Sequence, residues 1–145
     1  MLEYVTAGIG GQLFGIPIAR VQDVFVPDRF TPVPLAPPEI AGLLNVRGRI
    51  LTVVDMWKRL DLARKEVSKR QLALGVELKG ESYGLLIDQV GEVLKVAAGS
   101  REDPPINLDR GLAHVCAGVH RLDGKLLLVL DLDRVLEFGP LAKAA

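Results

Sequence analysis

The sequence IAGLLNVRGRILTVVDMWKRLDL, residues 40–62, decides the fold because a second version of it occurs near the other end of the chain. Residues 116–138 read CAGVHRLDGKLLLVLDLDRVLEF and align with it without a gap. The identical positions are Ala41, Gly42, Gly48, Leu51, Val53, Asp55 and Leu60, which recur as Ala117, Gly118, Gly124, Leu127, Val129, Asp131 and Leu136. Both versions contain a tight turn at glycine, an apolar strand after it and a helix-like segment at the end.

A second pair of matching segments lies upstream. QLFGIPIARVQDVF, residues 12–25, resembles ESYGLLIDQVGEVL, residues 81–94. Gly15, Ile18, Val21 and Val24 recur as Gly84, Ile87, Val90 and Val93. Because the two matches occur in the same order, they indicate a duplicated unit. We therefore expect a mainly β fold of two similar units, each a small barrel of about five strands, which leaves few strand edges open.

Short apolar segments bounded by Gly, Pro or Asp predict the strands. The candidates are residues 2–9, 12–18, 21–26, 49–54, 71–78, 82–88, 90–97, 114–120 and 125–131. Continuous apolar runs such as LTVV and LLLVL predict strands that are buried on both faces. The sequence AGSREDPPINLDRG, which follows the seventh candidate, predicts a long polar loop.

Helices are expected to be few and short. PPEIAGLLN, residues 37–45, has prolines where a first helical turn tolerates them. Asp55 is a candidate N-cap for MWKRL, and Asp131 or Asp133 for DRVLEF. DLARKEVSKR, residues 61–70, predicts a solvated connector, since no aromatic residue interleaves it to stack on nucleic-acid bases.

Composition limits the class of protein. The chain has 145 residues, 49% of them hydrophobic, which is enough for one compact domain or two very small subdomains. Lys and Arg together number 18, as do Asp and Glu, and this balance argues against general nucleic-acid binding. A single cysteine and an N-terminus without a signal-peptide pattern lead us to expect a soluble cytoplasmic protein.

The turn at Arg47-Gly48 poses a question. The matching turn in the second half, Asp123-Gly124, is a common hairpin signal whose Asp tolerates positive φ. Gly48 meets the same backbone requirement, but Arg47 contributes nothing evident to a turn. Its long side chain is either an ordinary surface arginine or a projecting bidentate donor that docks a partner. The residues alone leave both interpretations open.

The sequence predicts neither an enzyme nor a cofactor site. GIGG, residues 8–11, precedes a strand-like segment and so lacks the helix that a phosphate loop needs. His114, Cys116 and His120 at first resemble metal ligands. On one strand, however, the two histidines would lie roughly 20 Å apart, so at most two of the three residues could share a metal. We expect partly buried strand residues and no metal site.

Two further residue types have structural explanations. Asp55 and Asp131 occupy matched positions before helix-like segments, as paired helix caps would, whereas a catalytic pair need not be repeat-equivalent. Trp57 is expected in the core or at an interface between subdomains rather than as a ligand platform.

Taken together, five segments resemble the CheW-like domain family. They are FGIPIARVQDVF, TPVPLAPPEIAGLLNVRG, ILTVVDMWKRLDL, YGLLIDQVGEVL and GVHRLDGKLLLVLDLDRVL, which cover roughly residues 2–138. Each segment is weak alone, but their order and spacing are distinctive. The turn reads N-V-R-G where the family has N-L-R-G, and Asp23 stands where Glu is common.

The resemblance implies two five-stranded SH3-like barrels and a non-enzymatic adaptor. Such an adaptor joins the histidine kinase CheA, through the kinase's regulatory domain of the same fold, to methyl-accepting chemotaxis proteins. The cytoplasmic hairpin tip of the receptor would dock in a groove between the two barrels. A cytoplasmic protein recruited to membrane-associated receptor arrays is thus implied, with no cofactor, no nucleic acid and no direct membrane insertion.

The resemblance also assigns a partner-binding surface. Valines would supply apolar anchors, charged residues would set register and partner choice, and glycines would hold the backbone near the groove. The residues are Val21, Asp23, Val24, Gly42, Arg47, Gly48, Val90, Glu92 and Val93. Because Arg47 matches the arginine of the family's turn, the docking interpretation becomes the favoured one. Asp23 and Arg47 could pair with each other or with the receptor.

Alternatives and boundaries complete the prediction. We expect one CheW-like domain over residues 1–145, with subdomains near 1–70 and 71–145 and a possible exchange of strands between them. The equivalent adaptor of a type IV pilus or another chemosensory pathway is the alternative within the family. A small β-barrel that binds a ligand or nucleic acid is the alternative outside it, although the surface aromatic residues and basic face that it needs are scarce.

Overall fold

The computed structural model describes residues 1–27, 31–60 and 72–137 and contains two β-sheets. The five-stranded sheet is ordered β3 (Val21–Phe25), β6 (Leu72–Leu78), β7 (Glu81–Ile87), β5 (Arg49–Asp55) and β4 (Ile40–Val46). The six-stranded sheet is ordered β8 (Gln89–Val96), β1 (Leu2–Ile9), β2 (Gln12–Pro17), β11 (Lys125–Leu130), β10 (Cys116–Leu122) and β9 (Arg101–Glu102). The short helices are η1 (Ile18–Arg20), α1 (Met56–Arg59), η2 (Ala98–Ser100), α2 (Arg110–Val115) and α3 (Leu132–Val135). The prediction of a mainly β fold is confirmed. One sheet has a sixth strand because the two-residue β9 pairs with β10.

The two sheets repeat each other's strand pairing. β5 lies parallel to β7 with Val53 opposite Gly84, and β11 lies parallel to β2 with Val129 opposite Gly15. These four residues are the ones that the sequence repeat matches. The β-bulge in the β4–β5 pair recurs at the matching place in the β10–β11 pair. The duplication inferred from sequence is therefore present in the fold.

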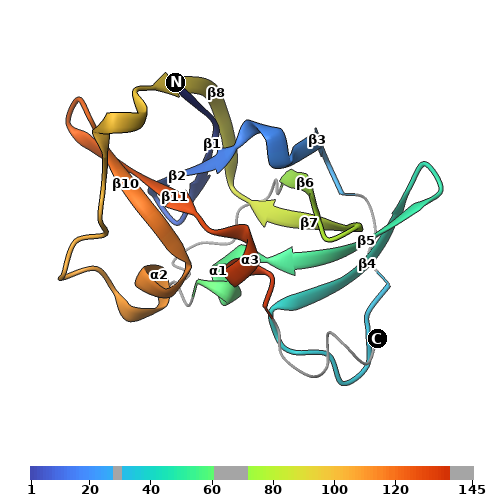
Figure 1. Ribbon diagram of the computed structural model, residues 1–145. Coiled ribbons are helices and arrows are strands. Elements are labelled where there is room, and N and C mark those ends of the chain that lie inside the picture. The colour runs from blue at the N-terminus through green and yellow to red at the C-terminus, as the bar shows by residue number, and fades with distance from the viewer. Residues whose placement is uncertain (28–30, 61–71, 138–145) are drawn as a thin grey trace.

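Each sheet takes strands from both halves of the chain. The β1–β2 hairpin pairs with β8 and β11, whereas the β6–β7 hairpin pairs with β3 and β5. Figure 1 shows the consequence, with blue strands beside orange ones in one sheet and yellow-green strands beside teal ones in the other. The predicted boundary at residue 70 thus does not describe the sheets. Strands of the first half and strands of the second half therefore complete each other's sheets.

The core explains why apolar runs are continuous. The largest cluster contains residues from both sheets and from α1, α2 and α3, and smaller clusters lie within each sheet. On β11, Leu128 and Leu130 belong to the large cluster, while Leu127 and Val129 belong to the cluster within the six-stranded sheet. Both faces of the strand are buried, as the LLLVL run predicted.

The helix expected over residues 37–45 is wrong. Residues 40–46 form β4, which pairs with β5 and places Leu44 opposite Leu51. Tertiary pairing overrides a weak helical signal here. The sequence repeat could have corrected this prediction, because residues 40–46 match residues 116–122, and residues 116–120 were already predicted as part of a strand.

The expected strand over residues 114–120 begins later. Residues 110–115 form α2, so His114 is helical and exposed, and β10 starts at Cys116. The expected polar loop before it contains η2 and β9. The predicted connector, residues 61–70, lies outside the described residues.

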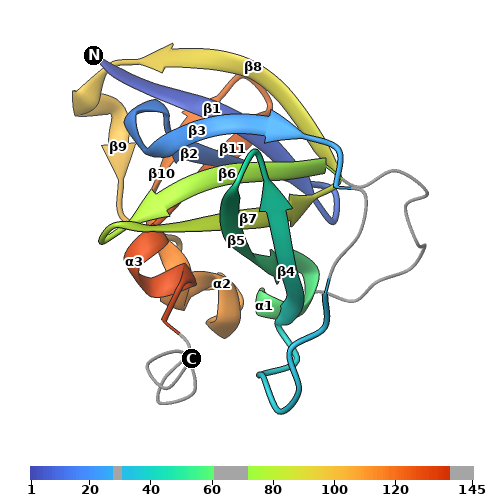
Figure 2. The same cartoon turned by 90° about the vertical axis from the view of Figure 1, so that its right-hand side faces the viewer.

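The predicted helix caps are confirmed. Asp55 Oδ1 accepts hydrogen bonds from the backbone N–H groups of Trp57, at 3.0 Å, and Lys58, at 3.4 Å. Asp131 Oδ1 accepts one from the Arg134 N–H at 3.3 Å, so Asp131 rather than Asp133 caps α3. All three α-helices gather at one end of the molecule (Figure 2).

Candidate partner-binding surface

The edge strands β3 and β8 carry most of the predicted site and occupy equivalent positions in their sheets. Both lie at the side of the molecule away from the α-helices (Figures 1 and 2). Val24 on β3 is 43% exposed and Val93 on β8 is 48% exposed, and these two valines match in the sequence repeat. Each edge therefore presents an exposed apolar side chain beside unpaired backbone, which is what a docking partner can cover.

The acidic residues on the two edges are placed differently. Asp23 is partly buried and lies over Gly75 of β6, where a Cβ atom would meet its Oδ1 at 2.4 Å. Glu92 is exposed, and its backbone carbonyl accepts a hydrogen bond from Thr6 Oγ1 at 2.7 Å. Val21 and Val90 are partly buried at the start of each edge strand. Asp23 is thus held against the sheet, while Glu92 is exposed to solvent.

The β4–β5 hairpin presents Arg47 at its tip. Arg47 has φ of 53° and Gly48 has φ of 81°, and the Gly48 N–H donates to Asn45 Oδ1 at 3.0 Å. Positive φ at both central residues matches a type I′ hairpin turn. In the matching turn of the second half, Gly124 has positive φ but Asp123 does not. The Arg47-Gly48 turn is therefore the one in which both central residues adopt the left-handed conformation. Gly42 is buried on β4 at the β-bulge, with φ of 155°.

The structure brings the Arg47 hairpin and β3 together. Arg49 Nη1 donates to Gln22 Oε1 at 2.8 Å, and Gln22 Nε2 donates to Glu77 Oε2 at 2.9 Å. These bonds tie β5 to β3 across the five-stranded sheet. Across the described ranges, no ion pair joins Asp23 to Arg47. The β8 residues belong to the other sheet, and Val90 of β8 and Val21 of β3 pack against the same core cluster.

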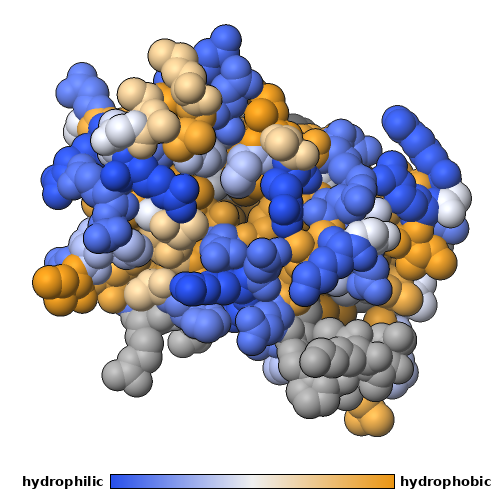
Figure 3. Space-filling model, in the orientation of Figure 1, coloured by the Kyte–Doolittle hydropathy of each residue, from blue (hydrophilic) through white to orange (hydrophobic). Residues whose placement is uncertain are grey.

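Sequence reasoning missed two exposed apolar residues close to β3 and the β4–β5 hairpin. Val26, next to the end of β3, is 73% exposed, and Ile50, at the start of β5, is 64% exposed. Figure 3 shows orange apolar surface interrupted by blue charged side chains on the face that it displays. Val26 continues the alternation that begins at Val24, and that pattern could have indicated it.

Gly48→Ala should lower the free energy of unfolding by about 1–2 kcal/mol, the cost of a left-handed non-glycine residue. A Cβ at Gly48 would meet nothing within 4 Å, so the cost is conformational and not steric. Urea denaturation of the variant measures it. Gly99→Ala is the matched control, since a Cβ there also meets nothing within 4 Å and no left-handed φ is involved. Equal effects of the two substitutions would contradict the turn geometry.

His114, Cys116 and His120, which at first resemble metal ligands in the sequence, have separate surroundings in the structure. No group of three or more His, Cys, Asp or Glu side chains in the described ranges could hold a metal ion. His120 is fully buried, and its Nε2 lies 3.2 Å from the Tyr4 hydroxyl while its Nδ1 lies 2.9 Å from Ser100 Oγ. Burial lowers the pKa of His120, and the positive charge of Arg101 lowers it further. Burial raises the pKa of the Cys116 thiol, so this cysteine is a structural residue.

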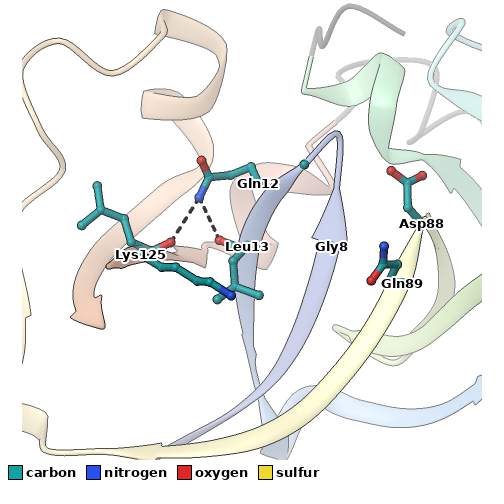
Figure 4. Close-up of a pocket in the computed structure, with 8 residues that line it drawn as sticks. Gly8, Gln12, Leu13, Asp88, Gln89 and Lys125 are labelled. Carbon is teal, nitrogen blue, oxygen red and sulfur yellow. Dashed lines mark hydrogen bonds between the residues drawn. The ribbon is translucent and has the colours of Figure 1, made fainter. Parts of the chain in front are cut away.

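A pocket of about 410 Å³ opens at the β1–β2 turn. Figure 4 shows Asp88 and Gln89 on one side of that hairpin and Gln12, Leu13 and Lys125 on the other. Gln12 Nε2 donates to the carbonyls of Leu13 and Leu126, each at 3.2 Å, so the Gln12 side chain is held in place.

The described residues include no helix long and apolar enough to cross a membrane.

Comparison with known proteins gives consistent matches. The family model described as CheW-like domain matches residues 3–138. The chain is 29% identical to the chemotaxis protein CheW of Rhizobium meliloti, over 92% of this chain and 86% of that protein. It is 32% identical to the protein PilI of Pseudomonas aeruginosa, over 57% of this chain and 46% of that protein. The crystal structure of the scaffolding protein TtCheW from Thermoanaerobacter tengcongensis aligns with a TM-score of 0.85 and 28% identity, covering 95% of this chain and 94% of that one.

Proposed function

Since the chain belongs to the CheW-like domain family, we propose that it is a non-enzymatic scaffold that couples methyl-accepting chemoreceptors to the histidine kinase CheA in chemotaxis. The match over residues 3–138 is the observation that carries this proposal. It is supported by relatives named chemotaxis protein CheW and by the likeness to a scaffolding protein across nearly the whole of both chains.

The receptor side of the proposal rests on the exposed edges. The cytoplasmic hairpin tip of a receptor is a pair of helices, and helix-in-groove binding needs apolar anchors with a charged rim. Val24 and Val93 offer the anchors, and Glu92 and Arg47 offer charges of both signs. Gly42 and Gly48 shape the hairpin that carries Arg47. These edge and hairpin residues form the proposed receptor-binding surface.

The proposed binding to the kinase is supported by the two β-sheets of this fold. A regulatory domain of the same fold would pair with this protein barrel to barrel, and the recruited protein would then sit in the membrane-associated receptor array. The β4–β5 hairpin projects from the body of the molecule, as Figure 1 shows at the right. Arg47 at its tip is exposed and reaches a partner without rearrangement of the core.

A pilus-associated pathway is the second candidate. The 32% identity to PilI over 82 residues favours it, although that match covers only 57% of this chain. A deletion strain separates the two pathways. Loss of swimming chemotaxis with normal twitching supports the first, and the reverse supports the second.

Arg47→Glu should abolish receptor-dependent kinase activation while leaving stability within about 0.5 kcal/mol, as is usual for exposed surface substitutions. The reversal of charge at the hairpin tip turns an attractive contact into a repulsive one. Kinase autophosphorylation with receptor-bearing membranes measures the effect. Lys79→Glu is the control, because Lys79 has φ of 52° and precedes Gly80 at 81° in the β6–β7 hairpin. Normal coupling by Arg47→Glu, or equal loss in both variants, would rule out a specific role for Arg47.

Co-sedimentation tests the function itself. The protein is mixed with the CheA kinase and receptor-bearing membranes of the same organism, and autophosphorylation is read in the pellet and the supernatant. We expect the kinase to pellet, and to respond to receptors, only when this protein is present. A kinase that never pellets in its presence would show that the family fold serves other partners.

A further inference from the structure

The chain crosses from one sheet to the other at Asp88, between β7 and β8, and this crossing is tightly held. Asp88 Oδ1 accepts a hydrogen bond from the Trp57 indole Nε1 at 2.7 Å, and its Oδ2 accepts one from the Gly10 N–H at 2.9 Å. The Asp88 N–H donates to the Gly8 carbonyl at 3.0 Å. One residue thus joins α1, the β1–β2 turn and the start of β8.

The equivalent crossing in the other half, at η1, is held more weakly. There Arg20 Nη2 lies 3.5 Å from Asp133 Oδ1, and the side chains are 40% and 68% exposed. Asp133 occupies the position of Trp57 in the sequence repeat, and Arg20 follows the position of Asp88. The Nε of Arg20 is buried and has no hydrogen-bond partner among the described residues. An exposed ion pair of this kind contributes little, whereas the Trp57–Asp88 bond is shorter, partly buried and charge-assisted.

We propose that Asp88 is a positioning residue for receptor binding, which locks the start of β8 and so sets where Val90, Glu92 and Val93 stand relative to the five-stranded sheet. The inference rests on the proposed function. Val90 lies two residues beyond Asp88, and β8 is an edge strand with a neighbour on one side only. Among the described residues β8 pairs with β1 on its inner side and with no strand on its outer side, so an anchor at its first residues adds to that one ladder in setting the presentation of its side chains.

The test uses Asp88→Ala, with Trp57→Phe as a second variant that removes the indole donor and keeps an aromatic ring at this position. Asp133→Ala is the matched control at the other crossing. Trp57 is the single tryptophan of the chain, so its indole N–H gives one resonance that reports the Asp88 bond directly. Affinity for a soluble receptor-tip fragment is measured by titration calorimetry at a temperature at which circular dichroism shows every variant fully folded.

We expect Asp88→Ala to shift the indole proton resonance upfield and to weaken receptor-tip binding about tenfold, the fold-change that matches the lower range for a charge-assisted hydrogen bond. Trp57→Phe should weaken binding in the same direction, and Asp133→Ala should bind like the unmodified protein. A purely structural role for Asp88 would change the melting temperature and leave the affinity of the folded protein unaltered.

The outcomes separate this inference from the function on which it rests. If the unmodified protein binds the receptor tip, and Asp88→Ala and Trp57→Phe bind it with the same affinity as the unmodified protein, the positioning role is overturned and the scaffold function stands. If Asp88→Ala fails to fold, unaltered binding by Trp57→Phe overturns the inference in the same way. If the unmodified protein itself does not bind, it is the proposed function that fails.

Discussion

Residues 1–70 and residues 71–145, made as separate fragments, are each expected to show no cooperative unfolding transition, and their mixture is expected to regain one. The reason is the exchange of hairpins. Without β6 and β7, strand β3 loses its connection to β5 and β4, because the two missing strands lie between them in the sheet. The β1–β2 hairpin would likewise lose β8 and β11, and an isolated hairpin is marginal in water.

The expected effect is the entire stability of the fold, about 5–15 kcal/mol for a natural domain. The main core contains residues of both fragments, including Phe14 and Met56 from the first and Leu74 and Leu128 from the second. Circular dichroism and thermal melts of each fragment, of the one-to-one mixture and of the intact chain measure the result. A cooperative melt of either fragment alone would show that each half can close a sheet with its own hairpin.

The second large effect is a loss of stability in mild acid that depends on His120. Ser100 Oγ donates its only proton to the Ala97 carbonyl at 2.8 Å, so it accepts from His120 Nδ1. His120 Nε2 is then unprotonated and accepts from the Tyr4 hydroxyl. A proton added at Nε2 would force this hydrogen bond to reverse and would place a positive charge in a fully buried site, where Arg101 repels it.

The direction in which stability changes with pH follows from the lowered pKa of His120. In the unfolded chain the imidazole takes up a proton near its ordinary value of 6.5, whereas in the folded chain burial, reinforced by Arg101, lowers its pKa. The unfolded state therefore binds more protons below about pH 6.5, and the free energy of unfolding falls as the pH falls through that value. The titratable and charged groups that face the ring are Tyr4 and Arg101.

Urea denaturation at pH 7.5, 6.5 and 5.5 tests this expectation. His120→Phe should lose about 1–3 kcal/mol at pH 7.5, since Tyr4 and Ser100 lose a buried partner, but most of the acid sensitivity should disappear. His114→Gln is the control, because His114 is the other histidine of the chain and is exposed. Acid sensitivity that survives in His120→Phe, or that disappears in His114→Gln, would place the titrating group elsewhere.

Local features were predicted well because local residues decide them. Asp55 and Asp131 cap helices since an N-cap needs only a short acceptor side chain beside the first turn. Strand positions followed from apolar runs and turn residues, and the run of residues 127–130 indicated burial on both faces. The strand over residues 40–46 was missed because Pro37 and Pro38, which precede it, imitate a helix start, and only pairing with β5 makes it a strand.

The surface exposure of several candidate residues could be predicted from the sequence, but their arrangement could not. The exposed valines on β3 and β8 and the exposed Arg47 lie where a partner can reach them. The contact of Arg49 with Gln22 joins segments far apart in sequence and has no local signal. The same holds for the bond between Trp57 and Asp88, since neither residue reveals the other as its partner.

By itself, the sequence determined the duplication, most of the strands, the capped helices and the family. Which hairpin completes which sheet was decided only by the tertiary structure. The repeated segments carry the same apolar and turn pattern in both halves, so that pattern does not distinguish units built from one half each from units that take strands from both halves. What distinguishes the two arrangements is the packing of the shared core and the two crossings at η1 and Asp88, and these energies arise only when the whole chain is assembled.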